Sequence, residues 1–333
     1  MLSGMETKSS ESLHVVLGGG QIGDRLATML AGRGETVRVI QRTARRDSRP
    51  NLTRLSGDVT DRAFLVRATE GASVIYDCMN PQYHQWAEKL LPLGAASLLA
   101  ASTNGARLVA LDCLYMYGAP NGPLREDSPR KPCSKKGELR VQLEQLRLDA
   151  HRRGDARITI ARASDFFGPA VPQSLFGPRF WQRLFAGKSL ECPGDPDQLH
   201  TYSYADDVAF GLATLGEHPE ASGRVWHLPA PPAESTRALF ERFGRAADRP
   251  VKVAGIPDWV WRTAGLFSPL MREAAEMTYQ WKVPYVLDDR HFRTTFGIEP
   301  TPIDRAVADT VRWALRQYRP GLDRASAKNI GSV

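Results

Sequence analysis

The 333-residue sequence predicts an α/β fold in which a doubly wound parallel sheet is followed by a smaller C-terminal lobe. Three observations lead to this prediction. Strand-like and helix-like patterns alternate from residue 13 to residue 162, as expected for a parallel sheet with helices on both faces. A glycine-rich turn joins the first strand pattern to the first helix pattern. After Arg162 the alternation stops and prolines punctuate a loop-rich region.

The predicted elements are short apolar strands separated by longer helical segments. In the lobe we expect a helix over 178–186, a strand leading into a helix over 201–215, a strand over 224–228 and mainly helices over 234–333. The six strands of the first part are predicted at 13–17, 36–40, 52–56, 73–77, 107–111 and 157–161, with helices from Gln21, from Asp61, over 82–103 and over 135–153.

Composition narrows the class of protein. The chain carries 44 Lys and Arg against 37 Asp and Glu, a net charge of +7, but the basic residues are spread along it without a stripe of interleaved aromatics. We therefore expect no nucleic-acid partner. No apolar run reaches the roughly 18 residues of a membrane span, so no membrane partner is expected. The four cysteines lack CxxC or metal spacing, which fits a reducing cytoplasm and predicts no bound metal.

The glycine-rich turn predicts a phosphate-binding loop. Gly18, Gly20 and Gly23 fit the GxGxxG pattern between a strand and a helix. Gly18 permits a tight turn, Gly20 lets a pyrophosphate approach the backbone, and Gly23 lets the helix pack closely on the strand. Amides at the helix start, from Gln21 and Ile22 onward, would hold the anion. This pattern predicts a Rossmann-type dinucleotide-binding domain.

The end of the second strand predicts which dinucleotide binds. An NAD site places Asp or Glu there to accept from the ribose hydroxyls. This chain has Gln41 and Arg42, followed by Arg45 and Arg46. Guanidinium groups suit a 2′-phosphate, so we predict NADP(H), with Arg42 as the selecting residue. The alternative is that these arginines merely solvate a loop.

Domain boundaries follow from these patterns. We expect a disordered leader over 1–12, a dinucleotide-binding domain over 13–168, and a mainly substrate-binding lobe over 169–333. Within the lobe, 201–230 is expected to return to the core of the first domain.

Ordered landmarks along roughly 13–320 resemble the extended short-chain dehydrogenase/reductases, in the NAD-dependent epimerase/dehydratase branch. GGGQIG stands at the family's glycine loop, one residue shorter than usual. The other landmarks are SGDVTD at 56–61, LYMYG at 114–118, RASDFFGP at 162–169 and YSYADDVA at 202–209. The resemblance implies that Asp58 and Val59 bind adenine. We also assign Met79, after the fourth strand, to the cofactor-binding residues.

The family's catalytic residues are altered here. Its Tyr-x-x-x-Lys pair aligns with Lys136 and Arg140, and its Ser or Thr aligns with Cys113. The resemblance therefore points to atypical members that keep the nucleotide fold and lose the usual dyad. Arg140 could still hold the ribose hydroxyls, but a permanent cation cannot shuttle protons.

Three residues remain candidates for catalysis. Tyr117, beyond the carboxyl end of the fifth strand, is a candidate proton donor, although Tyr115 lies close and an aromatic packing role is equally compatible. Lys136 would exchange a proton more readily if it were desolvated beside another cation; its alternative is a solvated lysine. Cys113 is a weak donor or nucleophile, or simply a small buried residue.

The sequence thus predicts a cytoplasmic NADP(H)-dependent oxidoreductase that reduces a carbonyl or activated double bond of a small organic molecule. The alternatives are a nucleotide-sugar epimerase or dehydratase, a redox-neutral isomerase or cyclase, and a non-catalytic NADP(H) sensor. Aromatic residues at 166–181 are core or, if exposed, line an apolar substrate site. The apolar helix over 82–103 is compatible with a homodimer interface.

Overall fold

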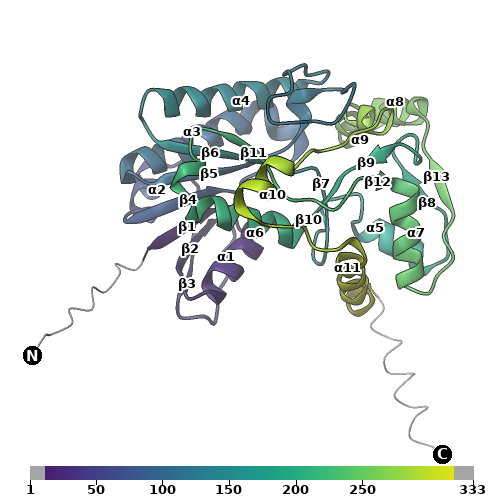
Figure 1. The fold of residues 1–333 in the computed structure, drawn as a ribbon, viewed down its shortest axis with the longest axis horizontal. Coiled ribbons are helices and arrows are strands. Elements are labelled where there is room, and N and C mark those ends of the chain that lie inside the picture. Colours follow the sequence, from purple (N-terminus) through teal and green to yellow (C-terminus); the bar gives the residue numbers. More distant parts are fainter. Residues whose placement is uncertain (1–11, 319–333) are drawn as a thin grey trace, which may run out of the picture. The chain divides into compact units, whose positions relative to one another are not determined.

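The computed structural model describes residues 12–318, which form two compact units that share the chain in alternating segments. The sheet unit comprises the described residues up to Asp112, Leu139–Arg162 and Ala209–Trp226. The lobe unit comprises Cys113–Glu138, Ala163–Val208 and the described residues from His227 onward. Figure 1 follows the chain through both units. Of the leader predicted over 1–12, all but Ser12 lies outside the described residues.

This division is interleaved at more places than the sequence predicts: the prediction sets one boundary after residue 168 and a return of 201–230 to the core. The connections that leave β5 and β6 at their carboxyl ends belong to the lobe unit. The segment that returns to the sheet unit is 209–226, shorter than the predicted 201–230. Hydrophobic periodicity identifies elements but not which unit a loop packs into, so the interleaving has no local sequence signal.

The sheet unit is built on a seven-stranded sheet with the order β11-β6-β5-β4-β1-β2-β3. The pairings that join β3, β2, β1, β4, β5 and β6 are all parallel. Strand order reverses between β1 and β4, and ligands of open parallel sheets bind beyond the carboxyl ends of the strands at such a point. The strands are β1 (Leu13–Leu17), β2 (Thr36–Gln41), β3 (Leu52–Ser56), β4 (Ala72–Asp77), β5 (Arg107–Asp112), β6 (Arg157–Arg162) and β11 (Val225–His227).

Helices flank this sheet, which confirms the predicted α/β class (Figure 1). The strands contribute Val, Leu and Ile to the core, and the helices contribute small residues such as Ala96, Ala100 and Ala150. Small side chains let the helices pack closely on a sheet that is buried on both faces. The helices are α1 (Gly23–Gly32), α2 (Arg62–Ala68), α3 (Trp86–Asn104), α4 (Lys135–Arg152) and α6 (Ala205–Glu217).

The lobe unit combines short strand pairs with helices around an aromatic core. Phe167, Phe176, Phe180 and Trp181 are buried core residues and give no support to an apolar substrate site, whereas Phe166 is half-buried. Its strands are β7 (Asp165–Phe167), β8 (Leu190–Cys192), β9 (Leu199–His200), β10 (Tyr202–Tyr204), β12 (Glu234–Ser235) and β13 (Val253–Gly255), which pair as β10-β7, β12-β9 and β13-β8. Its helices are α5 (Pro178–Phe185), α7 (Thr236–Ala246), α8 (Asp258–Phe267), α9 (Pro269–Ala275), α10 (Arg290–Phe296) and α11 (Ile303–Tyr318).

Candidate functional site

The glycine loop between β1 and α1 has the geometry of a ligand cradle. Gly18 has a φ of +99°, and a Cβ there would lie 3.0 Å from the carbonyl oxygen of Cys78. A Cβ on Gly23 would lie 1.9 Å from the oxygen of Gly18, whereas one on Gly20 would meet nothing within 4 Å. Gly18 and Gly23 are therefore required by the turn itself. Gly20 leaves open space beside the start of α1, and the N-cap residue of this helix, Ile22, provides no side-chain hydrogen bond to its first amides. This arrangement fits a diphosphate.

The loop after β2 carries the residues predicted to select the dinucleotide. Gln41, at the end of β2, uses its amide to bond the carbonyl of Thr43, and the Arg42 side chain is exposed. Arg42 and the hydrogen bonds from Thr60 lower the pKa of Asp58, with the Thr60 contacts the larger cause. Arg42 and Asp58 therefore lie within electrostatic reach of each other.

Among the neighbouring arginines, Arg45 lies 3.1 Å from Asp24 and Arg54 lies 2.5 Å from it. Arg42 has no such ion pair within residues 12–318. Because it also follows directly on β2, Arg42 stays the predicted ligand of a 2′-phosphate.

The carboxyl end of β4 is held by a buried ion pair. Asp77 Oδ2 accepts from Arg147 at 2.7 Å, and both side chains are at most 3% exposed. Asp77 Oδ1 accepts from the backbone N–H of Met79 at 3.1 Å. The α4 helix thus fixes the turn that carries Met79, which is half-buried beside the glycine loop.

The carboxyl end of β5 holds a second buried cluster in the sheet unit. Asp112 accepts from Arg140 at 3.0 Å and lies 3.5 Å from Arg162, and Arg162 lies 2.8 Å from Glu144. Arg140 also donates to Asn80 at 2.8 Å and stacks over the Trp86 ring at 4.3 Å. The guanidinium proposed to hold ribose hydroxyls is therefore engaged by protein acceptors, and the ribose contact stays a prediction.

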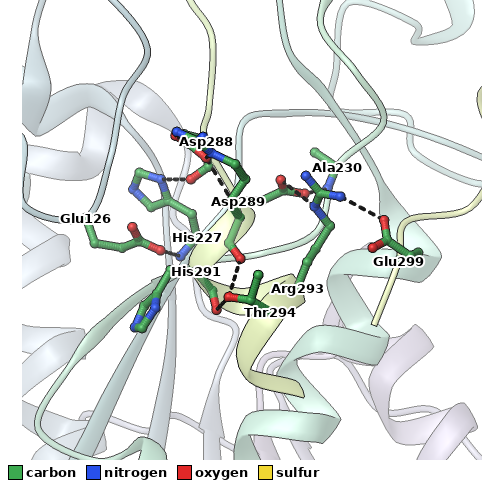
Figure 2. Close-up of polar contacts among 10 residues, drawn as sticks. Glu126, His227, Ala230, Asp288, Asp289, His291, Arg293, Thr294 and Glu299 are labelled. Atoms are coloured by element: carbon green, nitrogen blue, oxygen red, sulfur yellow. Dashed lines mark hydrogen bonds and ion pairs between the residues drawn. The ribbon is translucent and has the colours of Figure 1, made fainter. Parts of the chain in front are cut away.

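Tyr117 lies in the lobe unit and is hydrogen-bonded to a histidine. Its hydroxyl is 2.8 Å from His227 Nε2, and His227 Nδ1 is 3.1 Å from the carbonyl oxygen of Asp288. Glu126 accepts from the backbone N–H of His227 at 3.0 Å. Figure 2 shows the Asp288 carbonyl at the His227 ring and the Glu126 carboxylate at the His227 backbone. Burial raises the pKa of Glu126, and the N–H of His227 opposes that rise.

Lys136, where the family has its tyrosine, is closed inside an ion pair. Its Nζ donates to Glu276 at 2.6 Å and to Glu273, and the side chain is 3% exposed. Lys136 is expected to exchange a proton readily only beside another cation, but its ammonium group is bonded to two carboxylates. The lysine is also buried, not solvated, which corrects the surface alternative.

Cys113 is half-buried, and this exposure does not decide between a reactive thiol and a small packing residue. It acts electrostatically on Tyr279 and Tyr285, whose pKa values burial raises. Within residues 12–318, no three His, Cys, Asp or Glu side chains are grouped to hold a metal ion. None of the described helices is long and apolar enough to cross a membrane.

Sequence reasoning missed His227, Glu126 and Arg147. His227 ends a short strand, and its partner Tyr117 lies 110 residues away in the chain. Arg147 lies on α4 two turns beyond Arg140, a spacing that puts both on one helical face. That spacing was a usable signal for Arg147, whereas no local pattern marks the Tyr117–His227 pair.

The strand order and glycine loop define a Rossmann-type fold of the short-chain dehydrogenase/reductase class. The chain belongs to the NAD dependent epimerase/dehydratase family, whose model matches residues 14–228. This result confirms the resemblance. A comparison with curated proteins gives no significant match.

Solved structures confirm the fold. The enzyme WbmH of Bordetella bronchiseptica, in complex with NAD+, has 22% identity and a TM-score of 0.71 over 92% of this chain and 99% of its own. A dTDP-glucose 4,6-dehydratase of Streptomyces venezuelae, with NAD bound, has 20% identity and a TM-score of 0.72 over 92% and 98%. A UDP-N-acetylglucosamine 4-epimerase of Methanobrevibacter ruminantium, in complex with UDP-N-acetylmuramic acid, has 18% identity and a TM-score of 0.74 over 92% and 99%.

Proposed function

We propose that this protein is an NADP(H)-dependent oxidoreductase that interconverts a carbonyl and a hydroxyl group, or reduces an activated double bond, on a small organic substrate. Family membership supports an enzyme of the extended short-chain dehydrogenase/reductase type. The nicotinamide dinucleotide would supply or accept the hydride when bound.

The preference for NADP(H) over NAD(H) is argued from the two residues at the end of β2. The strand ends in Gln41 where an NAD site would place a carboxylate, and the next residue is the exposed Arg42. A guanidinium forms two parallel hydrogen bonds with a phosphate, and each charge-assisted bond contributes about 1.5–3 kcal/mol. Asp58, within electrostatic reach of Arg42, is the predicted adenine ligand on the same side.

The residues of this chain divide the work in the proposed reaction. The amides at the start of α1 bind the diphosphate, and Gly20 leaves room for it. Tyr117 supplies the proton to the substrate oxygen in reduction and takes it in oxidation. We do not assign this role to Lys136, because two carboxylates already hold its ammonium group.

Calorimetry and turnover test the proposal in sequence. NADP+ and NADPH should bind to the full chain at least about tenfold more tightly than NAD+ and NADH. NADPH should then be consumed in stoichiometric amounts with at least one member of a panel of aldehydes, ketones and enones. Absence of binding by all four dinucleotides would refute the proposal. Binding without turnover across the panel would favour a sensor.

A nucleotide-sugar epimerase or dehydratase is the second candidate. The family match favours it, as do the similar structures of a dTDP-glucose 4,6-dehydratase and a UDP-N-acetylglucosamine 4-epimerase. This chemistry oxidises a sugar hydroxyl transiently and regenerates the dinucleotide. Incubation with UDP- and dTDP-sugars, followed by chromatography, distinguishes it: a new sugar product with the dinucleotide unconsumed would identify this activity.

A further inference from the structure

We propose that His227 is the proton store for Tyr117, and that this pair does the work the family assigns to its Tyr-x-x-x-Lys dyad. The inference rests on the proposed function and deepens it. It starts from two contacts inside the lobe unit: Tyr117 Oη lies 2.8 Å from His227 Nε2, and His227 Nδ1 lies 3.1 Å from the carbonyl oxygen of Asp288.

The second contact fixes the tautomer of the imidazole. A peptide carbonyl only accepts hydrogen bonds, so Nδ1 must carry a proton. In the neutral ring Nε2 is then an acceptor, and the Tyr117 hydroxyl donates to it. The alternative tautomer would place two lone pairs against each other at Asp288. In the neutral state the phenol proton therefore already points at a base.

The surroundings of the pair support charge on both members. Arg130 lies 5.3 Å from the centre of the Tyr117 ring, and its Nη1 is fixed by the carbonyls of Glu126 and Ser128. This cation stabilises negative charge that develops on the phenol oxygen, as the lysine does in the family's dyad.

Glu126, whose carboxylate accepts from the backbone N–H of His227, and the backbone carbonyl of Asp288 at Nδ1 would stabilise an imidazolium at His227, which is fully buried. Two further charged groups face this cluster. They are Arg290, which forms an ion pair with Asp288, and His291. His291 lowers the pKa of Glu126, but its effect is smaller than the rise that burial causes.

Proton transfer balances in both directions. In oxidation, the substrate hydroxyl gives its proton to Tyr117 while Tyr117 gives its own proton to His227 Nε2. The electron pair that the O–H bond leaves on the substrate oxygen forms the carbonyl bond, while the hydrogen on the carbon leaves as hydride. The proposed dinucleotide would accept this hydride. In reduction, the imidazolium returns its proton to Tyr117 as Tyr117 protonates the substrate oxygen. Oxidation thus needs neutral His227, and reduction needs protonated His227.

The first test observes the tautomer without any substrate. Full-length protein labelled with 15N-histidine is compared by NMR with His227→Gln, which assigns the His227 signals, and with Tyr117→Phe. We expect a proton on Nδ1, an unprotonated Nε2, and a shift of Nε2 when the Tyr117 hydroxyl is removed. A neutral ring with its proton on Nε2 would overturn the proposal.

The second test uses pH profiles with a substrate found for the wild type. We expect kcat for oxidation to fall at low pH and kcat for reduction to fall at high pH. His227→Gln should lower kcat about 100-fold with little change in KM and should flatten both limbs. The matched control is His84→Gln, an exposed histidine of the sheet unit, which should keep the pH dependence of kcat in both directions.

The outcomes separate the two proposals. If His227→Gln keeps the fall of kcat at low pH for oxidation and at high pH for reduction, the role of His227 as proton store is overturned. The proposed oxidoreductase function is then left intact. Wild-type protein without turnover on any substrate overturns the oxidoreductase and the relay with it.

Discussion

The position of the family's dyad and the Tyr117–His227 pair differ in how their charges are satisfied. At the dyad position, Lys136 is neutralised by Glu273 and Glu276, and Arg140 is bonded to Asp112. In the Tyr117–His227 pair, a phenol and an imidazole are joined by a hydrogen bond. The first is a set of closed ion pairs, and the second is a pair of groups with a proton between them.

We expect this difference to separate a structural use of titratable groups, at Lys136 and Arg140, from the proposed catalytic use at Tyr117 and His227. A buried ion pair holds its protons firmly, since moving one would leave an unpaired charge in a low-dielectric interior. A hydrogen-bonded phenol and imidazole can exchange a proton with modest reorganisation, provided that countercharges stand nearby. The ion pairs therefore predict losses of stability, and the Tyr117–His227 pair predicts losses of turnover.

The largest expected effect on stability comes from breaking the buried Arg147–Asp77 pair. Arg147→Met leaves Asp77 charged and unpaired, which should lower the free energy of unfolding by about 3–5 kcal/mol. The double variant Arg147→Met, Asp77→Asn should recover most of that loss, because neither charge remains. Urea denaturation of the four proteins of this cycle measures the coupling. Additive losses would show that the pair is not coupled.

Lys136→Met gives the next effect and tests the dyad position directly. Removal of the ammonium leaves Glu273 and Glu276 without the cation that they share, so we expect the free energy of unfolding to fall by about 3 kcal/mol. Per folded molecule, kcat should change less than tenfold. Thermal melts between pH 5 and 8 and active-site titration measure the two quantities. A collapse of kcat in fully folded protein would instead make Lys136 catalytic.

Arg42→Ala sharpens the assignment of the dinucleotide. The loss of a charge-assisted contact to a 2′-phosphate should weaken NADP+ binding about 10- to 100-fold and leave NAD+ binding nearly unchanged. Arg49→Ala, an exposed arginine in the same segment, is the matched control and should change neither. Calorimetry measures all three proteins. Equal weakening for both dinucleotides would contradict 2′-phosphate recognition.

The sequence predicted the sheet unit well because its signals are local. Each strand from β1 to β6 lies within a residue or so of its predicted range, and Asp61 caps α2 as expected for the start of that helix. The glycine loop was predictable for the same reason: steric demands at Gly18 and Gly23 arise within a few residues or against the next strand.

The remaining site could not be predicted, because its contacts join distant segments. Lys136 meets Glu276 across 140 residues, and Tyr117 meets His227 across 110. From the sequence alone, Lys136 belongs to a basic run, and nothing near it indicates that Glu273 on α9 and Glu276 just after α9 supply two carboxylates. The alignment with the family located the altered positions, but only the packing shows that Lys136 and Arg140 are paired with carboxylates.

The smallest effect concerns His14, on β1, which is buried with Nδ1 3.2 Å from the Tyr76 hydroxyl. Burial, the largest cause, lowers its pKa below 6.5, although Glu35 acts in the opposite direction. Below pH 6.5 the unfolded chain therefore binds a proton that the folded protein excludes, so stability should fall as the pH drops through that region. His14→Gln should reduce the slope of unfolding free energy against pH between 7 and 5, and the exposed-residue variant His84→Gln should retain it. An unchanged slope in His14→Gln would show that other groups set the acid sensitivity of the sheet unit.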